Sequence, residues 1–202
     1  ELYAMGGVPA ERTDEVMGRI ASESSRMATL VEDLLTLARL DEGRPLDITD
    51  IDLVKLADNA VFDLQALDPT RTVGLTGISG RTPPMTLIIP GDRDRISQVF
   101  TNLIGNIVRY TPEGSPVEIA LGRSGDTAIV ELRDHGPGID ETDRGRVFER
   151  FYRADSSRNR KSGGSGLGLA IVSGILAGHR GNASLSKTKG GGLTVRIELP
   201  TT

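Results

Sequence analysis

Two asparagines one helical turn apart are the first residues that could do chemistry. Asn102 and Asn106 lie at i and i+4 in a run with a helical apolar pattern, so their side chains share one face. Asparagine is a mediocre residue inside helices, and an exposed polar face is the simple explanation for the pair. The functional explanation is a hard-cation site, because an amide oxygen suits Mg²⁺, which keeps several waters and shares its other positions with substrate phosphates.

The second cluster is a carboxylate followed by two glycines. Asp134 ends a strand-like run, and Gly136 and Gly138 follow it. A tight turn would account for these residues. They also fit a pocket in which backbone approaches a flat ring and the carboxylate accepts a hydrogen bond from an exocyclic amino group, as on adenine.

The third cluster is aromatic and basic. Phe148, Phe151 and Arg153 precede residues 154–165, a segment rich in serine and glycine that holds three basic residues and one acid. The segment is either a solvated basic loop or a mobile cationic lid, anchored by the pair Phe148 and Phe151, that closes over a bound ligand.

The fourth cluster is a glycine loop that opens a helix. Gly164, Gly166 and Gly168, with Leu167 between them, would offer backbone N–H groups to an anion at the helix N-terminus. The loop lacks the Gly-Lys-Ser/Thr ending of a P-loop and the last glycine of a dinucleotide-binding fingerprint, so both of these are excluded.

The apolar pattern predicts an α+β scaffold for these clusters. Asp92 is a good N-cap for the helix that carries the asparagine pair. The predicted helices span residues 10–40, 53–67, 92–109 and 168–177, and the predicted strands span 46–53, 71–75, 85–89, 117–121, 128–132, 183–186 and 193–199.

The first 43 residues differ from the remainder of the chain. They hold 4 basic and 9 acidic residues, a net charge of −5, whereas the whole 202-residue chain has a net charge of −4. The helix within them carries a broad apolar face with Met27, Val31 and Leu34, which predicts more than one partner helix. We expect an incomplete helical hairpin; the alternative is a single surface helix packed on the following domain.

Composition excludes several classes of protein. The chain has no cysteine, so disulfides and thiolate chemistry are excluded. Its acidic balance argues against nucleic acid as a partner. No apolar run approaches the roughly 20 residues of a membrane span. The chain begins with Glu1 rather than Met, which is typical of a fragment or a processed chain.

In order and spacing, the four clusters resemble the N, G1, F and G2 boxes of bacterial sensor histidine kinases. Residues 44–202 resemble the catalytic ATP-binding domain, and residues 1–43 resemble part of the dimerisation and histidine-phosphotransfer hairpin. The resemblance implies a two-layer α/β sandwich of the GHKL (Bergerat) type with a mixed sheet. It also implies the cytoplasmic portion of a membrane-anchored bacterial protein.

The resemblance also implies residue roles. Asn106 would bind Mg²⁺, and Asn106, Arg109 and Arg153 would act on the phosphates during catalysis. The residues it implies for ATP binding are Asn102, Asn106, Arg109, Tyr110, Asp134, Gly136, Gly138, Phe148, Phe151, Arg153, Gly164, Gly166, Leu167 and Gly168. Arg109 replaces a lysine that is usual at its position.

The phosphoacceptor of such kinases lies in a His-Glu-x-x-x-Pro sequence, and neither His135 nor His179 has this context. The resemblance therefore implies transfer of the ATP γ-phosphate to a histidine outside this chain, then to a response regulator, in a homodimer formed through the hairpin. The alternatives are a GHKL-type serine kinase that is also an anti-sigma factor, and a non-catalytic nucleotide-sensing module.

Overall fold

The computed structural model describes residues 13–80, 82–154 and 164–202. Its helices are α1 (Thr13–Asp41), α2 (Leu53–Leu67), the short 3₁₀ helix η2 (Ile78–Gly80), α3 (Arg93–Tyr110) and α4 (Gly168–Gly178). Its strands are β1 (Ile48–Asp52), β2 (Val73–Gly77), β3 (Ile88–Asp92), β4 (Val117–Ser124), β5 (Thr127–Asp134), β6 (Asn182–Lys187) and β7 (Leu193–Pro200).

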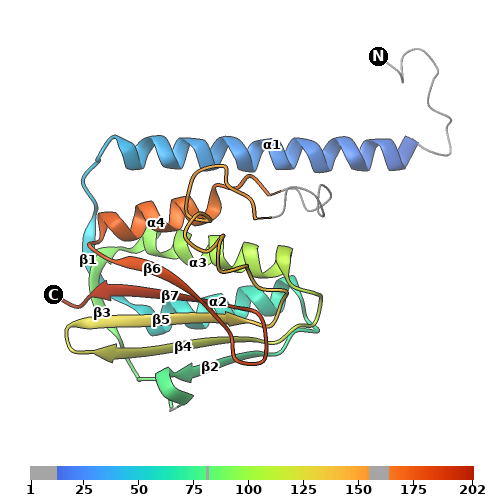
Figure 1. Cartoon of the computed structure of the whole chain (residues 1–202). Helices are drawn as coiled ribbons and strands as arrows, with labels where there is room; N and C mark the ends of the chain where they lie inside the picture. Colours follow the sequence, from blue (N-terminus) through green and yellow to red (C-terminus); the bar gives the residue numbers. More distant parts are fainter. Residues whose placement is uncertain (1–12, 81, 155–163) are drawn as a thin grey trace.

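A five-stranded sheet with the order β2-β4-β5-β7-β6 forms one layer of the molecule (Figure 1). β2 runs parallel to β4 and the other neighbours are antiparallel, so the sheet is mixed, as predicted. β1 and β3 pair separately as a two-stranded antiparallel ribbon. The β4–β5 register pairs Val117 with Asp134, which places Asp134 at one end of the sheet.

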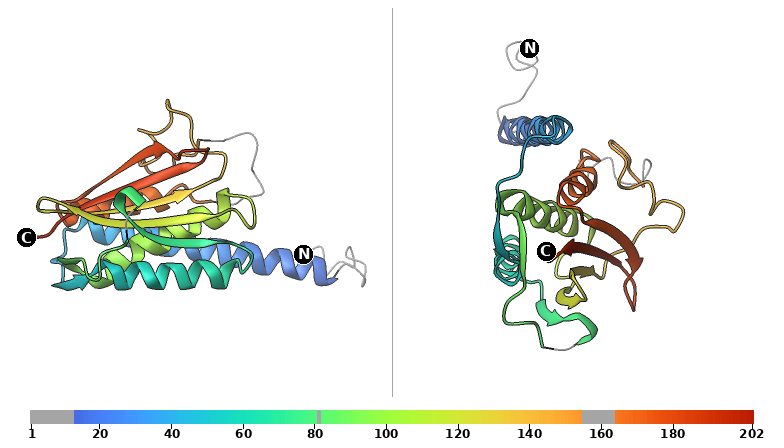
Figure 2. Two further views of the ribbon diagram at one scale, coloured as in Figure 1. Left: turned by 90° about the horizontal axis from the view of Figure 1, so that it is seen from below. Right: turned by 90° about the vertical axis from the view of Figure 1, so that its left-hand side faces the viewer.

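Helices α2, α3 and α4 form the second layer on one face of this sheet, and α1 lies outside them (Figure 2). α3 is strongly amphipathic and buries Ile96, Phe100, Leu103 and other apolar residues at helical spacing. Asp92 caps it, because its carboxylate accepts a hydrogen bond from the Arg95 N–H at 3.2 Å. The predicted two-layer α/β sandwich with a mixed sheet is therefore confirmed.

Two strand predictions are displaced along the chain. β3 begins at Ile88 rather than at residue 85, because Met85 is 95% exposed and does not join the sheet. β2 begins at Val73 rather than at residue 71, because the Arg71 backbone N–H closes a turn by bonding to Asp68 O at 3.1 Å. The predicted helix 53–67 coincides with α2.

α1 packs on the second layer through only part of its apolar surface. Leu37 is buried, and Leu40 contacts α4 so closely that a Cβ added at Gly174 would lie 3.1 Å from its Cδ1 atom. Met27 and Val31, which we expected to pack against partner helices, are more than half exposed. Residues 1–12 lie outside the described residues, so the hairpin and the domain boundary after residue 43 stay predictions. No helix in the described ranges is long and apolar enough to cross a membrane.

Candidate functional site

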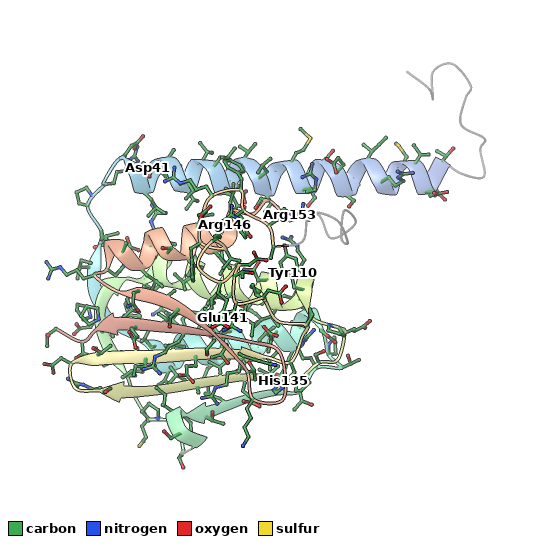
Figure 3. All side chains as sticks on the ribbon, in the orientation of Figure 1. Asp41, Tyr110, His135, Glu141, Arg146 and Arg153 are labelled. Carbon is green, nitrogen blue, oxygen red and sulfur yellow. The ribbon has the colours of Figure 1, made fainter. Side chains whose placement is uncertain are left out.

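A cavity of about 980 Å³ opens between α3, the end of β5, the N-terminus of α4 and α1. Figure 3 shows Tyr110 at the end of α3 and Arg153 between α3 and α1, with His135 well apart from both. The expected site residues that line the cavity are Asn102, Asn106, Arg109, Tyr110, Asp134, Gly138, Arg153, Gly166 and Gly168. The fold thus brings together residues from all four clusters.

The Asp134 carboxylate is buried and held through one of its oxygens. Asp134 Oδ1 accepts hydrogen bonds from the N–H groups of Gly136 at 2.9 Å and Leu193 at 3.1 Å. No hydrogen bond from the described residues reaches Oδ2. Asp134 lines the cavity, and Oδ2 is not one of the fully buried polar atoms that lack a partner, so this oxygen is accessible to a ligand that donates a hydrogen bond.

The asparagine pair lies on the opposite wall, beside the start of α4. A Cβ added at Gly168 would lie 3.8 Å from both amide atoms of Asn106 and 3.9 Å from Asn102 Oδ1, so a glycine keeps this space open. The buried Asn102 Nδ2 group has no hydrogen-bond partner within the described part of the chain. Asn106 also makes no hydrogen bond with the described residues, which leaves its amide oxygen available to a cation.

The N-terminus of α4 completes the polar end of the cavity. Its N-cap residue, Leu167, provides no side-chain hydrogen bond, and the first turn contains no acidic residue. Among the residues that the structure describes, Ser165 is the one side chain that bonds to the start of this helix, and its Oγ accepts from the Leu167 N–H at 3.2 Å. Free N–H groups at a helix N-terminus attract anions, and Arg109 on α3 also lines the cavity.

α1 contributes residues to the cavity that the sequence did not indicate. Asp33 accepts a hydrogen bond from the Ser165 hydroxyl at 2.9 Å. Burial raises the pKa of Asp33 above its usual value, and the Ser165 hydrogen bond and the Arg109 charge oppose this effect. Beyond the cavity, Arg150 donates to both carboxylate oxygens of Asp41 at 2.6 and 2.9 Å. α1 is therefore tied to the loops on both sides of the basic segment.

Five of the expected residues do not line the cavity. Gly136 and Gly164 lie next to residues that do line it. A Cβ added at Gly136 would clash with Thr111, and one added at Gly164 would clash with Tyr110 and Arg109. The five are Gly136, Phe148, Phe151, Gly164 and Leu167.

The aromatic anchor expected from Phe148 and Phe151 differs from the structure. The Phe151 ring is 61% exposed, with a backbone φ of 63°. Tyr152 lines the cavity instead, and its hydroxyl donates to Asp143 at 2.6 Å while Arg146 lies over its ring. The basic residues expected in the lid, Arg158, Arg160 and Lys161, lie outside the described residues.

The fold and this cavity define a class of protein. Residues 91–202 match the family described as histidine kinase-, DNA gyrase B-, and HSP90-like ATPase, and the chain belongs to this family of ATP-binding domains.

Known proteins of this class resemble the chain over most of its length. The probable sensor histidine kinase TcrY of Mycobacterium tuberculosis is 41% identical over 94% of this chain and 39% of TcrY. The solved ATP binding domain of PrrB from Mycobacterium tuberculosis is 29% identical, with a TM-score of 0.62 over 77% of this chain and 98% of that domain. Full-length ShkA in complex with AMPPNP is 25% identical, with a TM-score of 0.77 over 96% of this chain and 40% of ShkA.

These similarities confirm the resemblance to sensor histidine kinases. The chain spans about two fifths of the length of TcrY and of ShkA.

Proposed function

We propose that the cavity binds ATP together with Mg²⁺ and that the chain is the catalytic, ATP-binding part of a protein-histidine kinase. The observation that carries this proposal is the polarity of the cavity. A half-satisfied buried carboxylate, Asp134, lies at one end, and amides, arginines and a helix N-terminus lie at the other. This arrangement fits a ligand with a hydrogen-bonding base and a polyphosphate.

At the base end, Asp134 Oδ2 would accept a hydrogen bond from the adenine amino group. The neighbouring backbone at Gly138 and the Tyr110 ring line the space in which a flat base would lie. Two backbone N–H groups already hold the carboxylate in place, so little freedom is lost when the base binds.

At the phosphate end, the residues fit a Mg²⁺ ion that is shared with the nucleotide. The described residues contain no group of three His, Cys, Asp or Glu side chains that could hold a metal ion. The Asn106 amide oxygen would be a protein ligand of the ion. The Asn102 Nδ2 group, which lacks a partner among the described residues, would donate a hydrogen bond to a phosphate oxygen or a water. The ion would supply neutralisation of phosphate charge.

Phosphoryl transfer requires mainly positioning and charge neutralisation from a protein. Arg109, Arg153 and the α4 N–H groups would hold the β- and γ-phosphates in this way. The acceptor histidine lies elsewhere. Neither His179 nor His135 lines the cavity. The buried His179 ring has its nitrogens within hydrogen-bond distance of Ile175 O and the Asp92 N–H, and the His135 ring lies next to the Glu118 carboxylate.

The names of the relatives favour this function over the two alternatives. TcrY is named a sensor histidine kinase, which supports a histidine as acceptor rather than serine. We further propose that the complete protein is a membrane-anchored homodimer with this part in the cytoplasm, that the exposed apolar residues of α1 contact partner helices, and that the phosphoryl group passes to a response regulator.

Calorimetry with ADP or a non-hydrolysable ATP analogue tests the binding step. We expect binding that weakens when Mg²⁺ is removed with EDTA, and that is largely lost in the variants Asn106→Ala and Asp134→Ala. Absence of binding at millimolar nucleotide, or unchanged binding in both variants, would refute the proposal.

Transfer is tested by mixing the chain with a histidine-bearing phosphotransfer fragment and radiolabelled ATP. We expect acid-labile label on the fragment, as phosphohistidine is acid-labile. Label that survives acid would indicate a serine kinase, and binding without any label would indicate a nucleotide-sensing module.

A further inference from the structure

Thr111, the residue directly after α3, has its hydroxyl held from both sides. The Thr111 Oγ1 atom donates to Ile107 O at 2.7 Å and accepts from Arg71 Nη1 at 2.9 Å. A hydroxyl that donates once and accepts once in a buried position has no freedom to rotate. The Thr111 methyl group is therefore fixed as well.

The fixed methyl group lies close to Gly136, the first glycine after Asp134. A Cβ added at Gly136 would lie only 2.7 Å from Thr111 Cγ2 and 3.2 Å from Asp134 Oδ1. The Gly136 N–H is one of the two donors that orient the Asp134 carboxylate. A continuous chain of contacts thus runs from the Thr111 methyl through Gly136 to the carboxylate.

Arg71 makes the support of Thr111 rigid. Its guanidinium also donates to Ser115 O at 2.8 Å and to Pro112 O at 3.2 Å, and it pairs with Asp68 at 3.1 Å. The side chains of Arg71 and Asp68 are only 1% and 6% exposed. The loop that follows Thr111 is therefore clamped to the end of α2.

We propose that Thr111 is a positioning residue that sets the selectivity of the cavity for the base. Its methyl group fixes Gly136, and Gly136 in turn aims the free oxygen of Asp134 at the exocyclic amino group. This inference rests on the proposed binding of ATP and assigns the discrimination between bases to a residue outside the four clusters.

Two substitutions at this position separate the methyl group from the hydroxyl. Thr111→Ser removes the methyl and keeps both hydroxyl hydrogen bonds. Thr111→Val removes the hydroxyl and keeps a methyl at the same position, because valine has the shape of threonine and is equally stiff at χ1. Ile107 O still accepts from the backbone N–H of residue 111, and Arg71 Nη1 keeps its hydrogen bond to Ser115 O while its second hydrogen loses the Thr111 acceptor.

The readout is the preference for ADP, which is the dissociation constant of the diphosphate of purine riboside, a nucleotide without the amino group, divided by that of ADP, both measured by calorimetry with Mg²⁺. A hydrogen bond to a charged group predicts a preference for ADP of about tenfold or more in the unsubstituted chain. We expect Thr111→Ser to lower this ratio several-fold by weakening ADP alone, and Thr111→Val to keep it within about twofold. Thermal unfolding confirms that both variants are folded.

A rescue experiment provides a second test, because one substitution is expected to reverse part of the effect of the other. Gly136→Ala should abolish the preference for ADP, because its Cβ meets the Thr111 methyl. The double variant with Thr111→Ser should recover part of it, because the nearest clash is gone.

The proposal is overturned if Thr111→Ser keeps the original ratio, if Thr111→Val loses as much as Thr111→Ser, or if the double variant recovers nothing. Equal affinity for the two nucleotides in the unsubstituted chain would overturn it while leaving ATP binding intact. Binding of neither nucleotide would refute the proposed function itself.

Discussion

Replacing Arg71 with methionine tests how much the buried guanidinium contributes to the stability of the fold. The change keeps an unbranched side chain of similar length but removes the donors to Thr111, Ser115 and Pro112 and leaves the Asp68 carboxylate without its cation. Breaking a buried pair by removing one partner costs about 3–5 kcal/mol, against a total stability of about 5–15 kcal/mol for a typical domain. At about 2–4 °C per kcal/mol for a chain of this size, Tm should fall by roughly 6–20 °C.

The assay is urea unfolding and thermal unfolding of both proteins at neutral pH, with Arg196→Met as the matched control. Arg196 also contacts two carboxylates at 2.8 Å, but its side chain is 34% exposed, so we expect a loss of no more than about 1 kcal/mol. Arg71→Lys keeps the charge without the planar fork and should fall between the two variants. A loss in Arg71→Met no greater than that in the control would refute the reasoning that this group is a structural clamp.

Three further predictions concern the site and the sheet. Asp134→Asn keeps an oxygen for the two backbone N–H groups but turns the free acceptor into a donor, so calorimetry should show adenine nucleotides binding at least about tenfold more weakly with Tm little changed. Gly192→Ala should be severely destabilising in thermal unfolding, because its Cβ would overlap Asp134 O at a φ of 103°, whereas Gly191→Ala has a similar φ and open space and isolates the backbone strain of about 1–3 kcal/mol. Burial raises the pKa of Glu131, but hydrogen bonds from two neighbouring arginines outweigh this and hold it below its usual value. Its contribution to stability is therefore present above the usual glutamate pKa of about 4.3 and is lost as the pH falls through the folded-state pKa, so urea unfolding from about pH 5.5 to about pH 3 should show a smaller loss in Glu131→Gln than in the unsubstituted chain.

The parts of the fold that depend on local signals could be predicted from the sequence. α2 and α3 were predicted because their apolar residues recur at helical spacing, and Asp92 also indicated the start of α3; the Asp52 cap of α2 is a finding of the structure. The predicted bounds of β3 were wrong because an apolar residue such as Met85 can lie in a loop as well as in a strand. Only pairing with distant partners, such as Ile48 with Asp92, determines where β3 ends.

The same distinction applies to the site. Asp134 and the glycines near it were predicted because their spacing along the chain is itself the signal. Thr111 and Asp33 were missed because their roles arise from contacts between distant segments: Thr111 lies 40 residues from Arg71, and Asp33 lies 132 residues from Ser165. No local pattern marks such pairs, and the individual roles of the predicted site residues stay predictions.

The way α1 is attached has a mechanical consequence. Its side-chain hydrogen bonds to the second layer and its loops involve Asp33 and residues after it, and Leu30 packs against the core. The preceding turns, including Ser22 and Arg26, form an outer wall of the cavity. An α-helix is stiff and rises about 1.5 Å per residue, so Ser22 lies about 16 Å along the axis from Asp33. A tilt of only about 10° at these links would therefore move Ser22 by about 3 Å, roughly the diameter of a water molecule. A small rotation of α1 near Asp33 would therefore change the width of the cavity mouth.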